Sequence, residues 1–149
     1  MKLVFADPKS GFVFQKEVEG AKERQLVGKK IGDKADGAIA GLEGYELQIT
    51  GGTDKSGFPM RRDISGVQRV KALLSGGAGI RGIHRGQREN RQVVGGTVNE
   101  NIAQVNAKIT TYGAKPLSDF GFVPLSQEER NKKKEEKAAA KAAPKARKK

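Results

Sequence analysis

The chain has 149 residues, of which 36% are hydrophobic and 31% charged, and its formal net charge at pH 7 is +12. This length predicts one domain with a tail, and the lack of cysteine and presence of a single histidine exclude disulfide scaffolds, thiolate zinc sites and most metal centres. No stretch approaches the ~18 apolar residues that span a bilayer, and charge and proline come too early for a secretory signal, so we expect an intracellular protein with no membrane partner.

The positive charge is concentrated in two parts of the chain. Residues 61–92 carry 8 basic and 2 acidic residues, residues 126–149 carry 10 and 4, and the rest is balanced at 11 of each. A basic excess of this size attracts polyanions whatever their sequence. Because the internal segment is rich in arginine, whose planar guanidinium suits phosphate, we expect it to bind nucleic acid rather than only to keep the chain soluble.

The N-terminal half predicts strands. KLVFAD and FVFQKEVE flank the turn sequence PKSG and predict a β-hairpin, with Phe12, Phe14 and Val18 partly alternating. Frequent glycines over residues 22–42 argue against long helices. The alternating segment YELQIT at residues 45–50 predicts a half-buried strand that ends at the two glycines after it.

The second half predicts a mixture of short elements. The spacing of Val67, Val70, Leu73 and Leu74 predicts a helix with Ser65 as its N-cap. Further along the chain the pattern predicts a short strand, a helical turn and another strand, over residues 92–98, 99–106 and 107–113 respectively. Short strands separated by glycine turns are typical of a small barrel.

We therefore predict a mainly β fold, a small glycine-rich β-barrel with short helices, over residues 1–125. Residues 126–149 form a second region, a Lys/Ala-rich tail that is basic and helix-prone. The composition of this tail fits two roles. It either keeps the chain soluble without a fixed structure or lies along an RNA groove through residues such as Lys132, Lys133 and Lys134.

The stretch GGAGIRGIHRGQREN carries a competing signal, because Gly77, Gly79 and Gly82 satisfy the G-x-G-x-x-G spacing of a dinucleotide-binding loop. That motif requires a strand before the loop and a helix after it, whose N-terminus holds the pyrophosphate. Here a predicted helix enters the loop, and IHRGQRENRQ after it has no apolar face. His84 has no accompanying nucleophile or carboxylate cluster, so we predict neither a cofactor site nor a catalytic site.

Arginine dominates the same stretch. Arg81, Arg85, Arg88 and Arg91 recur every three or four residues, and the glycines among them favour an irregular loop that follows a curved backbone. Residues 61–92 contain no Phe, Tyr or Trp, whereas modules that read single strands rely on aromatic stacking. We therefore expect contacts with the phosphates and the shape of a folded RNA.

One further motif resembles that of a known family, the e-type small-subunit ribosomal protein six of archaea and eukaryotes. The resemblance covers about residues 1–125 and rests on Gly-Gly-x-Asp-Lys-x-Gly-Phe-Pro-Met. RVKALLSGGAG, RGQRENRQVVGGTV and the Ile-x-x-Val-Asn-x-x-Ile pattern at residues 102–109 support it. The motif residues are Gly51, Gly52, Asp54, Lys55, Gly57, Phe58, Pro59 and Met60.

The resemblance implies a structural ribosomal protein with no enzymatic activity, no cofactor, no metal and no small-molecule substrate. Its partners would be small-subunit ribosomal RNA and neighbouring ribosomal proteins, so we expect a cytoplasmic ribosomal constituent rather than an independent homo-oligomer. The residues expected to face RNA are Lys55, Arg61, Arg62, Arg69, Lys71, Arg81, His84, Arg85, Arg88, Arg91, Lys132, Lys133 and Lys134. A free-standing transcription or chromatin protein on a similar barrel is the alternative.

The sequence also departs from the family pattern. Gln87, Glu89 and Asn90 interrupt a basic run that is often denser in the family. The tail has Ser126 as its only hydroxyl residue, so the phosphorylation control of eukaryotic members is not carried over. A short tail fits an archaeal member.

Overall fold

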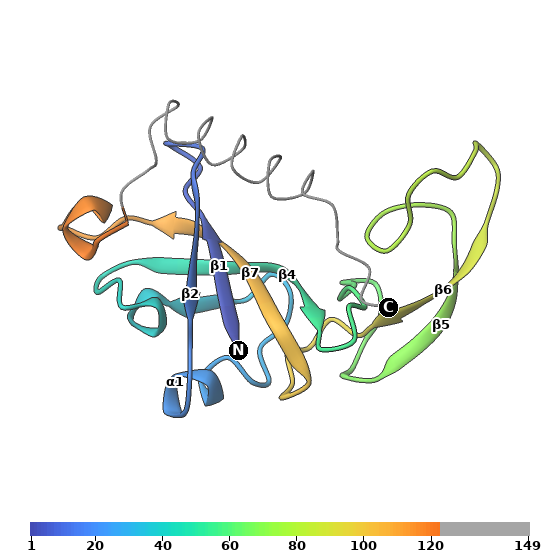
Figure 1. Cartoon of the computed structure of the whole chain (residues 1–149), viewed down its shortest axis with the longest axis horizontal. Helices are drawn as coiled ribbons and strands as arrows, with labels where there is room; N and C mark the ends of the chain where they lie inside the picture. Colours follow the sequence, from blue (N-terminus) through green and yellow to red (C-terminus); the bar gives the residue numbers. More distant parts are fainter. Residues whose placement is uncertain (123–149) are drawn as a thin grey trace, which may run out of the picture.

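The computed structural model describes residues 1–122, which form a mainly β fold (Figure 1). The strands in chain order are β1 (Lys2–Ala6), β2 (Val13–Glu17), β3 (Lys34–Asp36), β4 (Glu46–Asp54), β5 (Arg69–Leu74), β6 (Glu89–Val94) and β7 (Ile102–Thr111). The helical elements of this region are α1 (Ala21–Arg24) and the 3₁₀ turns η1 (Gly37–Ala40) and η2 (Leu117–Phe120). The prediction of a mainly β chain with short helices is confirmed.

Five strands form one sheet in the order β2-β1-β7-β4-β3. The pairing of β1 with β7 is parallel and the other pairings are antiparallel. The predicted N-terminal hairpin is present, with Lys2 opposite Glu17 and Ala6 opposite Val13. The remaining two strands, β5 and β6, pair with each other as a separate ribbon that projects to one side of the sheet (Figure 1).

The predicted barrel is wrong, because the sheet does not close. In the described part of the chain its edge strands β2 and β3 each pair along one side, and β5 and β6 join neither edge. Local patterns reveal that short strands exist, but closure depends on strand tilt and on a long-range register that those patterns do not contain. With only three residues, β3 also offers little backbone to a further partner.

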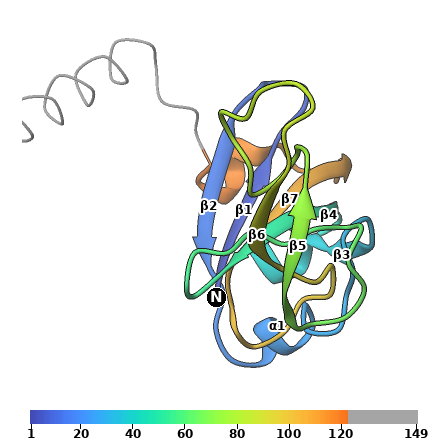
Figure 2. The same cartoon turned by 90° about the vertical axis from the view of Figure 1, so that its right-hand side faces the viewer.

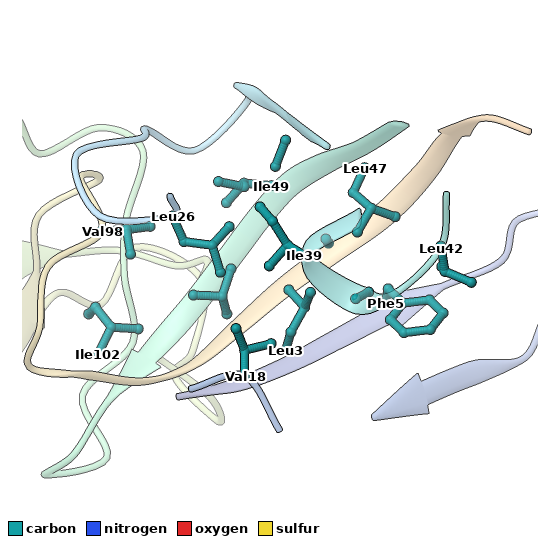
Figure 3. Packing of buried hydrophobic residues seen from close by; sticks show 14 of the residues in the cluster. Leu3, Phe5, Val18, Leu26, Ile39, Leu42, Leu47, Ile49, Val98 and Ile102 are labelled. Carbon is teal, nitrogen blue, oxygen red and sulfur yellow. The ribbon is translucent and has the colours of Figure 1, made fainter. Parts of the chain in front are cut away.

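One hydrophobic core covers a face of the five-stranded sheet. Figure 3 shows Leu3 and Phe5 of β1 and Leu47 and Ile49 of β4, which belong to this core and are at most 1% exposed. The connecting segments cover these side chains with Val18, Leu26, Ile39, Leu42 and Val98. Burying one such side chain is worth about 1.5–3 kcal/mol. The five-stranded sheet with its core is therefore the stable part of the fold, and the β5–β6 ribbon is attached to it.

The helix predicted over residues 65–75 is instead strand β5. Its residues pair with β6 from Arg69 opposite Val94 to Leu74 opposite Glu89. The i, i+3, i+4 spacing that predicted a helix does not mark a buried face here, because Val70 and Leu73 are 41% and 58% exposed. Cross-strand pairing with β6 overrides the weak local signal.

The helical turn predicted over residues 99–106 is also wrong, since this segment enters the long strand β7. Ile102 and Val105 are both buried although they lie three residues apart. The pairing with β4 shifts register between Thr53 and Asp54, which are opposite Gln104 and Ile102. This bulge changes the alternation of the buried residues and produces a spacing that looks helical in the sequence.

Strand β4 runs further than predicted, through both glycines to Asp54. A Cβ atom on Gly52 would lie 2.6 Å from the carbonyl oxygen of Gln104 and 2.8 Å from Sδ of Met60. Gly52 therefore allows two neighbouring segments to approach the strand closely, and the pair of glycines does not mark its end.

Candidate nucleic-acid interface

The Gly51–Met60 motif forms the connection between the sheet and the ribbon. The N–H of Met60 donates to the carbonyl of Gly52 at 2.9 Å, and the N–H of Val94 in β6 donates to the carbonyl of Pro59 at 3.0 Å. The N–H of Arg61 donates back to the carbonyl of Val94 at 2.9 Å. Residues 59–61 thus lie between β4 and β6 and fix the ribbon to the core.

An ion pair between the exposed Arg69 and the buried Asp54 reinforces this connection. Nε of Arg69 lies 2.6 Å from Oδ2 of Asp54, and its guanidinium also donates to Oγ of Ser56 at 2.8 Å and lies over the ring of Phe58. The Asp54 side chain is 3% exposed and that of Arg69 is 40% exposed. The hydrogen bond from Arg69 lowers the pKa of Asp54 and outweighs burial, which raises it.

Arg61 also has partners within the fold. Its guanidinium donates to the carbonyls of Gly76 and Ala78 at 3.0 and 3.1 Å and pairs with Asp63 at 2.6 Å. The side chain is 13% exposed. Of the residues predicted to face RNA, Arg61 and Arg69 therefore position the ribbon and its loop.

The loop of residues 75–88 joins β5 to β6, with Gly77, Gly79, Gly82 and Gly86 at positive φ. At Gly79 a Cβ atom would lie 3.1 Å from Cγ of Pro59, so the loop backbone folds closely against the motif. The chain enters this loop from a strand and leaves it into β6. Because no helix follows, the loop lacks the helix N-terminus that would hold a pyrophosphate.

We call the loop of residues 75–88 the arginine loop. Its exposed basic side chains are Arg81, His84, Arg85 and Arg88. Within residues 1–122, none of these side chains has an acidic partner, although the nearby Arg91 pairs with Glu89 at 2.7 Å. Figure 2 shows the ribbon, which carries the loop, in front of the five-stranded sheet. The structure thus displays uncompensated positive charge away from the core.

An open groove of ≈ 890 Å³ lies between the arginine loop and the turn of the motif. Its walls include Phe58 and Pro59 on one side and Ile80, Arg81 and Arg91 on the other. Sequence reasoning found no aromatic residue within 61–92 and missed that the fold brings Phe58 to this surface. Apolar walls with a cationic side can accept both a phosphate and the face of a sugar or base.

The other predicted residues lie apart from the arginine loop. Lys71 is exposed on β5, Lys55 is exposed in the turn after β4, and Arg62 is exposed beside a smaller pocket. Lys132, Lys133 and Lys134, like the predicted boundary after residue 125, lie outside the described residues. Among the described residues, those predicted to face RNA therefore fall into three groups. One group lies on the arginine loop, the second consists of Arg61 and Arg69 with partners inside the fold, and the third consists of separate basic residues elsewhere on the surface.

No helix in the described region is long and apolar enough to cross a membrane. Among residues 1–122, no three His, Cys, Asp or Glu side chains are grouped so that they could hold a metal ion.

The fold and the exposed arginines define a basic, mainly β protein with a surface suited to polyanions. The family model "Ribosomal protein S6e" matches residues 1–121, and the chain belongs to this family. The prediction of the family from the Gly51–Met60 motif, and of its archaeal branch, is confirmed. The family is one of structural ribosomal proteins, so the prediction that the chain is not an enzyme is confirmed as well.

Curated relatives agree with this assignment. The small ribosomal subunit protein eS6 of Methanocaldococcus jannaschii is 48% identical over 118 residues, which cover 79% of this chain and 88% of that protein. The protein of the same name from Archaeoglobus fulgidus is 45% identical over 119 residues, covering 79% and 92%. That of Methanoculleus marisnigri is 39% identical over 128 residues, covering 86% and 97%.

Proposed function

We propose that the protein is a structural constituent of the small ribosomal subunit that binds ribosomal RNA through the arginine loop. Membership of the S6e family and the names of the relatives support the assembly. The observation that carries the RNA contact is the exposure of Arg81, Arg85 and Arg88 without an acidic partner among the described residues. Such guanidinium groups neutralise phosphates and so help folded RNA to hold its shape.

Ion pairs within the fold limit the number of phosphates that the basic residues of segment 61–92 can neutralise. Its eight basic residues include three with carboxylate partners: Arg61, Arg69 and Arg91. The five without such a partner in the described region are Arg62, Lys71, Arg81, Arg85 and Arg88. At about −0.9 per phosphate on a duplex, five contacts give a slope of about −4.5 for log affinity against log salt.

The partners and location follow from this assignment. The protein would act in the ribosome, which is cytoplasmic in archaea, beside other ribosomal proteins and without a cofactor or a small-molecule substrate. Family membership does not favour the free-standing transcription or chromatin protein considered from the sequence. Lys132, Lys133 and Lys134 would add phosphate contacts of the same kind.

Sedimentation of small subunits from a cell lysate at moderate salt tests this function. We expect the wild-type chain to sediment with the small subunit. The variant Arg81→Ala/Arg85→Ala/Arg88→Ala should leave that fraction at a lower salt concentration. A wild-type chain that stays out of the small subunits and follows DNA would contradict the proposal.

A further inference from the structure

A second concave site lies away from the arginine loop, at the end of the ribbon where β5 begins. It is a pocket of ≈ 220 Å³. The side chains that matter here come from three separate segments and are Lys30, Arg62, Ser65 and Thr97. Ile31 and Ile64 provide apolar walls. We call this site the basal pocket.

Backbone hydrogen bonds hold the three segments of the basal pocket together. The N–H of Ile31 donates to the carbonyl of Gly96 at 2.9 Å, and the N–H of Gly96 donates to the carbonyl of Ile64 at 2.8 Å. The N–H of Thr97 donates to the carbonyl of Gly66 at 3.1 Å. The pocket is therefore built into the fold before any ligand arrives, which lowers the entropic cost of binding.

The charges at the basal pocket are uncompensated. Lys30 and Arg62 are exposed, and neither side chain pairs with an acid in the part of the chain that the structure describes. Of the acids nearest in sequence, Asp33 accepts the backbone N–H of Lys30 at 2.7 Å and Asp63 pairs with Arg61, and neither carboxylate lines the pocket. Two cations thus face the same cavity without a carboxylate to neutralise them.

Hydroxyl groups complete the set of donors. Ser65 and Thr97 line the cavity, and within residues 1–122 neither hydroxyl makes a hydrogen bond to another protein group. A phosphate presents several acceptor oxygens and a negative charge, which match two cations and two hydroxyl donors. A carboxylate has fewer acceptor sites, and an apolar ligand would leave both charges without a partner.

We infer that the basal pocket binds a phosphate group of the RNA backbone, at a point separate from the arginine loop. The inference rests on the proposed RNA-binding function and names a second contact for it. The six residues of β5 span about 20 Å at ~3.3 Å per residue. One RNA held at the pocket and at the loop would fix the orientation of the ribbon as well as its position.

The test uses the full chain, transcribed small-subunit ribosomal RNA and the double variant Lys30→Gln/Arg62→Gln. Lys22→Gln/Arg24→Gln is the matched control, because it removes the same two charges from exposed positions outside the pocket. Loss of two phosphate contacts should flatten the salt slope by about 1.8. When the salt concentration rises fourfold, the fall in RNA affinity should then be about tenfold larger for the wild type than for the pocket variant. Equal effects of the two variants would overturn the inference.

A second arm uses inorganic phosphate and separates the possible sources of the ligand. Amide NMR signals of Ser65, Gly66, Gly96 and Thr97 should move when phosphate is added to the wild type, and stay fixed in Lys30→Gln/Arg62→Gln. Movement with phosphate but not with RNA would assign the pocket to a free anion and refute the RNA contact. Signals that move with neither would refute the pocket itself.

The two arms also separate this inference from the proposed function. If the wild type fails to bind the RNA at all, the proposed function fails, and the phosphate titration still reports on the pocket. If the wild type binds RNA and the pocket variant matches its control, only the basal contact is refuted. Equal melting temperatures of all variants show that binding, and not folding, has changed.

Discussion

Replacement of Arg69 by alanine should destabilise the protein, because it leaves the carboxylate of Asp54 buried without its guanidinium partner. Breaking a fully buried pair costs about 3–5 kcal/mol, and breaking an exposed pair costs about 0–1 kcal/mol. Here one side chain is 3% exposed and the other 40%, so we expect an intermediate loss of about 2–3 kcal/mol. At about 4 °C per kcal/mol, the melting temperature should fall by about 8–12 °C.

The loss should depend on pH in a defined direction. In the wild type, Arg69 lowers the pKa of Asp54 below the ordinary 3.8, so the pair contributes stability above that pH and loses it as the pH falls further. In Arg69→Ala the largest lowering influence on the pKa of Asp54 is lost, while burial still raises this pKa and backbone hydrogen bonds from Lys55 and Ser56 still lower it. The pKa of Asp54 is therefore higher than in the wild type, and protonation on acidification relieves the unpaired charge. The difference between variant and wild type should therefore shrink from pH 7 towards about pH 4.

Urea unfolding followed by circular dichroism at both pH values measures these effects. Arg69→Lys should recover part of the stability, because it restores a charge near Asp54 but cannot reproduce the two-pronged contact with Asp54 and Ser56. Arg24→Ala is the control, since Arg24 is exposed and lies on α1. A loss below about 0.5 kcal/mol at pH 7, or one independent of pH, would refute the role assigned to this pair.

Two further substitutions test the packing around the interface and the core. Gly95→Ala should cost about 2 kcal/mol or more in urea unfolding, because its Cβ would lie 2.1 Å from the carbonyl oxygen of Gly66. Gly51→Ala, with nothing within 4 Å of its Cβ, is the matched control, and equal losses would contradict the close approach. Tyr112→Phe should cost about 1.5–3 kcal/mol at neutral pH, because it removes a hydrogen bond to the buried carboxylate of Asp7. Burial raises the pKa of Asp7, but hydrogen bonds, among them those from Ser10 and Tyr112, outweigh burial and lower this pKa. The loss of stability in Tyr112→Phe, measured by thermal melting, should therefore shrink below about pH 4. A loss that grows below that pH would contradict the role assigned to this hydrogen bond.

Local sequence patterns predicted part of this fold and missed its long-range features. The β1–β2 hairpin was predictable because its turn and both strands are contiguous in the chain. Strand β5 was not, because its identity depends on pairing with β6 across the arginine loop. The bulge in β7 places the buried Ile102 and Val105 three residues apart, a spacing that predicts a helix although the segment is a strand. Barrel closure failed as a prediction for the same reason, since it depends on which edges meet.

The candidate interface shows the same division. Charge density and glycine spacing located the arginine loop, because both are local properties of residues 76–90. The internal roles of Arg61 and Arg69 were hidden, since their partners Gly76 and Asp54 lie 15 residues away in each case. The basal pocket was missed because Lys30 lies in a segment of balanced charge and reaches the site only through the pairing of its segment with residues 96–97.

The salt dependence of RNA affinity tests the central claim most directly. For Arg81→Ala/Arg85→Ala/Arg88→Ala, the slope of log affinity against log salt should flatten by about 2.7 relative to the wild type. The control Lys22→Ala/Arg24→Ala/Lys108→Ala removes the same charge from exposed positions and should flatten it by less than about 1. Equal slopes for the two variants, with both folded, would show that net charge rather than the arginine loop binds the RNA.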